Sequence, residues 1–199
     1  MKLLITLLLI AMSGSVLAAV VVYSGAYNIA ADEPHWGAVY RLIETVRDRS
    51  IAVRAGKIQP PVITDPARIA RGANDYAEMC EACHLAPGMD QSEIREGLYP
   101  KPPKLTERID ASPAELFWVI KHGIKMTAMP AWGPTHEDSR LWDIVAFLQK
   151  LPALTPEQYQ VLVNESHRTE QPAVTHQHHH DPRGSAGASQ HHQPIRSKQ

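Results

Sequence analysis

The sequence has few cysteines, few phenylalanines and no surplus of either charge. Two cysteines among 199 residues cannot build the disulfide framework of a small secreted scaffold. With 20 Lys and Arg against 21 Asp and Glu, the net charge of −1 lacks the basic surplus that nucleic-acid binding requires. No stretch alternates apolar and polar residues as a half-buried strand would. We therefore expect one all-α domain of modest size with appendages, and no nucleic-acid partner.

A long apolar run occupies the N-terminus. Of the 20 residues at positions 3–22, 16 are apolar and none is charged. A helix of this length spans the hydrocarbon layer of a bilayer. Lys2 before the run predicts that the start stays in the cytoplasm and that the rest of the chain is exported. The alternative is a signal peptide cleaved after Val16-Leu17-Ala18, which would leave a soluble exported protein.

The other end of the sequence is polar and rich in histidine. Residues 167–199 carry 7 of the 11 histidines, among them His178, His179 and His180. The tail has few apolar residues, and their burial cannot offset the entropy cost of ordering the chain. We therefore expect this tail to be disordered. Its imidazoles are candidate ligands for a divalent metal such as copper, nickel or zinc. The alternative is a solvated tail without a ligand.

Breaks in the helical periodicity divide the chain between these ends. We expect an anchor or signal peptide at residues 1–23, a helical spacer at 24–65, a domain at 66–154, and a polar linker with the tail at 155–199. Within the domain, Asp65 before Pro66 and the capping box Ser112-Pro113-Ala114-Glu115 mark two helix starts. The expected helices are residues 66–83, 112–123 and 135–151. The long loop at 85–110 needs something to wrap around.

Both cysteines fall in one motif, Cys80-Glu81-Ala82-Cys83-His84. C-x-x-C-H is the attachment signature of c-type haem. Thiols three residues apart share one helix face and can add to the two vinyl groups of one porphyrin, and the histidine that follows is then an axial ligand of the iron. A thioredoxin-like pair would follow a strand, and a structural zinc site would need four ligands. A disulfide would leave His84 without a role. We therefore expect one covalent haem c.

Residues 66–154 around this motif resemble the class I monohaem cytochromes c. That family has a glycine eight residues and an aromatic residue four residues before the first cysteine, which correspond here to Gly72 and Tyr76. In the family both pack on the last helix, where the matching positions are Ile144 and Phe147. The resemblance implies a cytochrome c fold, in which three main helices and long loops surround one covalent haem. A glycine at this crossing lets two helix backbones approach closely.

The resemblance also implies the remaining haem contacts. Pro103 and Leu105 resemble the family's Pro-x-Leu segment, whose carbonyl holds the ligand imidazole and whose leucine covers the ring. Met129, followed by Pro-Ala-Trp-Gly, resembles the loop that supplies the second axial ligand. Met126 and His122 are the alternative ligands. In a third interpretation, the methionines only fill gaps in the core.

This ligand set indicates electron transfer rather than catalysis. Iron with His and Met ligands has no open position for a substrate, and the sequence offers no acid–base pair beside it. We expect a one-electron carrier in a respiratory-type chain that exchanges electrons with a redox partner protein or complex. We expect it to be anchored in the bacterial inner membrane, with the haem domain in the periplasm. Two alternatives stay open: a haem subunit of a membrane dehydrogenase or oxidase, and a metal-handling protein that uses the histidine tail.

Overall fold

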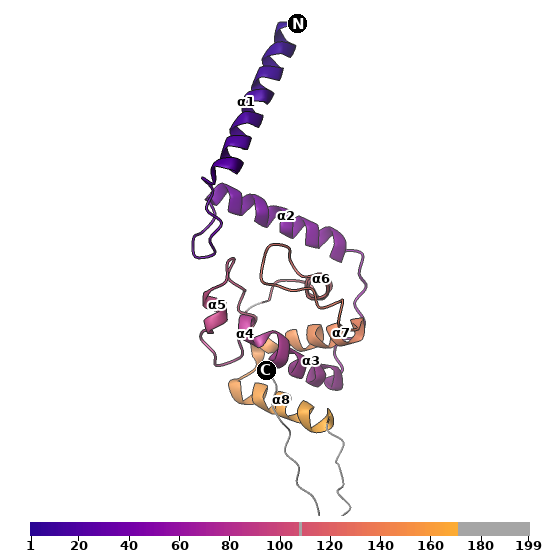
Figure 1. The fold of residues 1–199 in the computed structure, drawn as a ribbon. Helices are drawn as coiled ribbons and strands as arrows, with labels where there is room; N and C mark the ends of the chain where they lie inside the picture. Colours follow the sequence, from indigo (N-terminus) through magenta and orange to yellow (C-terminus); the bar gives the residue numbers. More distant parts are fainter. Residues whose placement is uncertain (108, 171–199) are drawn as a thin grey trace, which may run out of the picture.

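The computed structural model describes residues 1–107 and 109–170, and these residues form helices and loops without a strand (Figure 1). The expected all-α fold is confirmed. The elements in chain order are α1 Lys2–Ser24, α2 Gly37–Ala55, α3 Pro66–Met79, α4 Glu81–His84, α5 Glu93–Glu96, α6 Pro113–His122, α7 Asp138–Leu148, the 3₁₀-helix η1 Leu151–Ala153, and α8 Pro156–Glu170.

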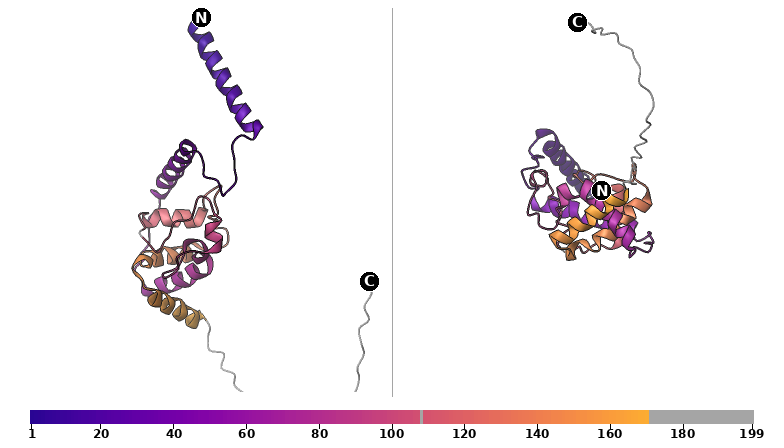
Figure 2. Two further views of the ribbon diagram at one scale, coloured as in Figure 1. Left: turned by 90° about the vertical axis from the view of Figure 1, so that its left-hand side faces the viewer. Right: turned by 90° about the horizontal axis from the view of Figure 1, so that it is seen from below.

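Helix α1 projects away from the other elements (Figures 1 and 2). None of its residues is buried, although 17 of its 23 residues are apolar. By length and composition it could cross a membrane, and it is the one described helix that meets this test. A helix that is apolar on every side needs an apolar environment all round. The other described residues do not provide that environment.

The core forms where α3 crosses α7, with α8 against α3 and α6 against α7. Gly72 sits at this crossing, and a Cβ added there would lie 2.9 Å from the amide nitrogen of Ile144 and closer still to the carbonyl of Asp143. Ion pairs tie the same two helices together, with Arg71 at 2.7 Å from Asp143 and Arg140 at 2.6 Å from Asp75. The close packing predicted for Gly72 is therefore confirmed.

The helix starts follow the capping signals in the sequence. The Asp65 carboxylate accepts a hydrogen bond from the Ala67 amide at 3.0 Å, with Pro66 as the first helical residue. Ser112 and Glu115 form the reciprocal capping box of α6. The first domain helix differs from the prediction, because the backbone at Cys80 leaves the helical region with φ −120° and separates α3 from α4. Helix α7 begins at Asp138, three residues later than expected.

The segment after residue 154 also differs from the prediction. In place of a polar linker, α8 follows almost directly, with side chains of Thr155 and Gln158 bonding each other's backbone amides at its start. Tyr159 is buried between α8 and α3, where its hydroxyl donates to the Glu81 carboxylate. Leu162 packs on the same core. The linker prediction was wrong here because these few apolar residues recur on one helix face. The tail predictions at residues 171–199, including His178, His179 and His180, lie outside the described residues.

Candidate functional site

The two cysteines lie at the junction of α3 and α4. Cys80 is the buried residue between these helices, and Cys83 is half-buried inside α4. Neither forms a disulfide. Burial raises the pKa of the Cys80 thiol to about 12, so this sulfur keeps its proton at neutral pH. Both residues are thus available as thiols, and a thiol adds S–H across a carbon–carbon double bond without any oxidant.

The ring of His84, at the end of α4, is held by the loop that follows α5. Its Nδ1 lies 2.9 Å from the carbonyl oxygen of Pro103 and donates its hydrogen there, while the amide of Leu105 donates to the His84 carbonyl at 3.3 Å. Burial lowers the pKa of His84, which favours the neutral imidazole. Since Nδ1 carries the hydrogen, Nε2 keeps its lone pair for a metal. The structure thus brings together His84, Pro103 and Leu105.

Met129 lies in the irregular loop between α6 and α7. It is half-buried and packs against the buried cluster that contains Cys80, as Leu105 does. Its amide donates to Thr127 Oγ1 and its carbonyl accepts from the Ile124 amide, both at 3.1 Å. Met126 is 99% exposed. His122, the other alternative ligand, is also exposed, with its ring beside Trp118.

Two glycines seat this methionine loop on the end of α6. Gly123 has φ +64° and ψ −171°, and a Cβ there would lie 2.7 Å from the Met129 carbonyl oxygen and 2.8 Å from the Ala131 amide nitrogen. A Cβ at Gly133 would lie 2.9 Å from the carbonyl oxygen of Lys121. The sequence predicted Gly123 only as the end of a helix. In the structure it also lets the backbone around Met129 lie directly on α6.

Arg95 is a site residue that sequence reasoning missed. It belongs to α5 and is only 8% exposed. Its Nη2 donates to the Pro102 carbonyl at 3.1 Å. The carbonyl of the next residue, Pro103, accepts from His84, so two consecutive carbonyls hold the two side chains. Its Nε is buried and has no hydrogen-bond partner among the described residues. Its Nη1 lies 3.6 Å from the Glu96 carboxylate, so the charge is already paired, and only Nε remains as a donor for a further acceptor. Nothing in the polar stretch around it distinguishes this arginine from solvated neighbours.

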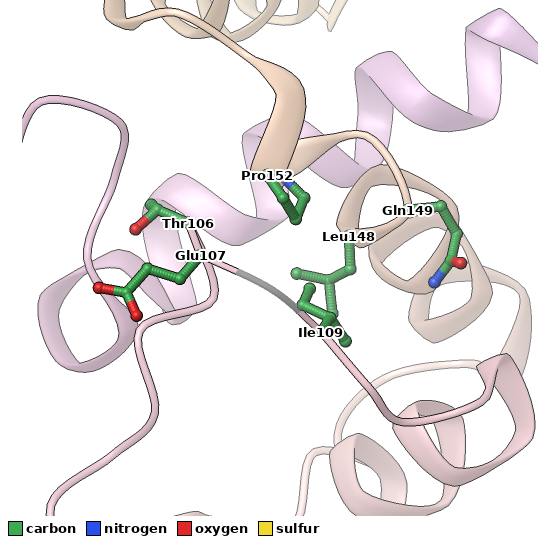
Figure 3. A pocket seen from close by; sticks show the side chains of 6 residues that line it. All are labelled: Thr106, Glu107, Ile109, Leu148, Gln149 and Pro152. Atoms are coloured by element: carbon green, nitrogen blue, oxygen red, sulfur yellow. The ribbon is translucent and has the colours of Figure 1, made fainter.

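A shallow hollow of about 400 Å³ lies elsewhere, between the loop after Leu105 and the end of α7. Figure 3 shows Ile109 and Leu148 together on one side of it, with Thr106 and Glu107 opposite. Gln149 and Pro152 complete the lining. None of the predicted haem-binding residues lines this hollow. The site is therefore defined by the motif residues and not by the hollow.

Comparison with known families decides the class of the domain. A family model described as cytochrome c oxidase, cbb3-type, subunit III matches residues 67–148. Residues 67–148 form a c-type cytochrome domain. No curated protein matches the chain. The matched range runs from α3 to the end of α7, so α1, α2 and α8 lie outside it.

The residues of the cytochrome domain fit the covalent haem c that such a domain implies. The C-x-x-C-H motif supplies two free thiols and an imidazole with Nε2 available. Met129 supplies a thioether at the same core. The unused Nε of Arg95 is a donor of the kind that the carboxylates of a haem require.

Proposed function

We propose that this protein is a one-electron carrier with a single haem c, attached through Cys80 and Cys83 and ligated by His84 and Met129. We further propose that α1 anchors it in a bacterial inner membrane, with the cytochrome domain on the periplasmic side in a respiratory-type chain. When bound, the haem supplies an iron centre that accepts and releases one electron.

The contrast between the candidate ligands supports this ligand set most directly. The His84 ring has its Nδ1 fixed on Pro103, which leaves Nε2 for the iron. Met129 packs against the core that contains Cys80, whereas Met126 is almost fully exposed. Two ligands from the protein would leave the iron no position for a substrate, and this favours electron transfer over catalysis.

The surrounding residues hold the two proposed ligands in place. The Pro103 carbonyl fixes the imidazole plane, and the Ile124 amide fixes the backbone of Met129. Leu105 and Trp132 pack against the same buried cluster. A ligand set that is fixed before the electron arrives needs little rearrangement between the two oxidation states, which favours rapid transfer.

The charges of the cytochrome domain favour an encounter with a partner in the same membrane. Three lysines near the site are each within 4 Å of a carboxylate: Lys101 with Glu96, Lys104 with Glu107, and Lys121 with Asp138. Such local pairs cancel most of the long-range field that would steer a soluble partner. An anchored carrier needs less steering, because the membrane raises the local concentration of its partner.

A second candidate is a haem subunit of a membrane oxidase or dehydrogenase. It is favoured by the matching family model, which is named for an oxidase subunit. Isolation of the full chain from its own membranes in mild detergent separates the two proposals. A stable complex with a catalytic subunit would support the second candidate, and a haem protein that migrates alone would support the first.

The ligand set is tested by Met129→Ala against the matched control Met126→Ala. We expect Met129→Ala to abolish the sulfur-to-iron charge-transfer band of the oxidised protein and to let added imidazole bind the iron. Met126→Ala should leave both properties unchanged, because this side chain is exposed. Loss of the band in Met126→Ala alone would show that the wrong methionine has been chosen.

The covalent attachment is tested by replacing Cys80 and Cys83 with Ala together. The double variant should show no haem stain on a denaturing gel, because no thioether remains to hold the porphyrin. Ser92→Ala is the control, since Ser92 lies beside the motif and bonds the Ala82 carbonyl without being a thiol. Covalent haem in the double variant would refute the proposed attachment.

A further inference from the structure

Helix α2 is more than a spacer, because it is fixed to the cytochrome domain. It packs on α6, and its last residue, Ala55, is buried. The chain that leads into it is fixed too: the His35 amide donates to the Tyr99 hydroxyl at 3.1 Å, and the Tyr27 hydroxyl lies 2.7 Å from His35 Nδ1. The His35 ring also contacts the Tyr99 ring edge-on. Contacts at both ends of α2 therefore set its orientation on the domain.

An exposed face of α2 carries an apolar stripe that no part of the described chain covers. Leu42, Val46 and Val53 are 59–65% exposed. Their spacing of four and seven residues places them on one face of the helix. We call these three residues the α2 stripe. Trp36, directly before the helix, is also exposed. An aromatic residue of this kind is typical of a membrane–water interface.

The position of α1 relative to α2 indicates what covers this stripe. In Figure 1 α2 lies across the end of the domain from which α1 projects, and the left view of Figure 2 shows the same arrangement. Only residues 25–36 separate the two helices. A bilayer crossed by α1 would therefore begin close to α2, on the side away from the domain.

The charges of α2 fit a lipid surface as well. The helix has four basic and two acidic side chains: Arg41, Arg47, Arg49 and Arg54 against Glu44 and Asp48. An apolar stripe with a basic surplus beside it is the pattern of a helix that lies in the headgroup region, where anionic lipids attract it.

From these observations we infer that the α2 stripe lies on the lipid surface, with α2 between the bilayer and the cytochrome domain. This inference rests on the proposal that α1 crosses the membrane. It goes beyond anchoring, because it gives the haem domain one orientation at the bilayer. A domain on a flexible spacer would have no fixed orientation.

The test uses the full-length haem protein in nanodiscs of phosphatidylethanolamine and phosphatidylglycerol. Both native thiols are taken by the proposed haem linkage, so a single added cysteine can carry a spin label. The three variants are Val46→Cys in the α2 stripe, Met12→Cys in α1, and Gln160→Cys on the exposed side of α8, at the opposite end of the domain from α1. The accessibility of each label to oxygen and to a water-soluble nickel chelate is measured by power saturation, with nitrogen as the reference. A high ratio of oxygen to nickel accessibility indicates a label in lipid.

We expect the ratio of oxygen to nickel accessibility at position 46 to exceed that at position 160 several-fold, and to approach that at position 12. A lipid-exposed label at 12 with an aqueous label at 46 would overturn the inference and leave the anchor intact. Aqueous labels at both positions would overturn the anchor and the inference together. A label at 46 that neither reagent reaches would show that a protein covers the stripe, and would also overturn the inference.

Discussion

Replacing Gly123 with Ala should displace the loop that carries Met129. The backbone at Gly123 has φ +64° and ψ −171°, a region that is essentially restricted to glycine. The new Cβ would lie 2.7 Å from the Met129 carbonyl oxygen and 2.8 Å from the Ala131 amide nitrogen. These are backbone atoms, so no rotation of a side chain relieves the overlap.

The size of the effect follows from these two contributions. Holding alanine in this backbone region costs about 1–3 kcal/mol. Ordinary contacts of this kind lie at about 3.5 Å, so the loop must also retreat by about 0.7 Å. If Met129 ligates the iron as proposed, we expect a shift of about 2 kcal/mol, which corresponds to roughly thirtyfold more of the state with Met129 off the iron.

The assay is the sulfur-to-iron charge-transfer band together with the affinity of the oxidised protein for added imidazole. In Gly123→Ala the band should weaken, and imidazole should bind about thirtyfold more tightly, because Met129 competes less well. Gly97→Ala is the matched control. Its Cβ would meet only the Ile94 carbonyl, at 3.8 Å, and its φ of −85° suits any residue. An unchanged band with imidazole affinity within about twofold of the parent protein would refute the reasoning.

Two further predictions concern the supports of the site. Gly72→Ala should gain about 1 kcal/mol of helix propensity but lose about 3 kcal/mol by overlap with the α7 backbone. The net loss should lower the midpoint of thermal unfolding, followed by circular dichroism, by about 8–16 °C. The control Gly37→Ala has open space around its Cβ and should leave the midpoint unchanged. A Gly72→Ala midpoint equal to that of the parent protein would contradict the close crossing of α3 and α7. Arg95→Gln should lower the reduction potential by tens of millivolts, because a nearby cation stabilises the reduced iron. The exposed Arg49→Gln is its control in redox titration, and a potential unchanged by Arg95→Gln would show that Arg95 lies too far from the iron.

The parts of the site that the sequence predicted are those encoded by local patterns. The capping box at Ser112 and the proline start at Pro66 set helix boundaries through contacts within a few residues, and both appear as expected. The C-x-x-C-H motif combines all its chemistry in five residues, so it predicted a covalent haem without any knowledge of the fold. Gly72 was predictable because its spacing from Cys80 matches the pattern of the resembled family.

The parts that the sequence did not predict depend on contacts between distant segments. Arg95 resembles any charged residue of a polar loop, and neither its burial nor its bond to the Pro102 carbonyl has a marker in the sequence. Tyr159 stands in a polar stretch, and its burial depends on α3 and Glu81, which lie far earlier in the chain. The end of α3 at Cys80 reflects the backbone turn into α4 and has no marker such as proline or glycine.

The contact between Tyr159 and Glu81 has a consequence for the maturation of the protein. Glu81 stands between the two cysteines, and α8 reaches it from a segment more than seventy residues later in the chain. Cys80 is buried in the finished fold. If haem is attached through Cys80 and Cys83 as proposed, we expect the attachment to precede the packing of α8 on the motif. The docking of this last helix would then mark the point at which the chain no longer admits its cofactor.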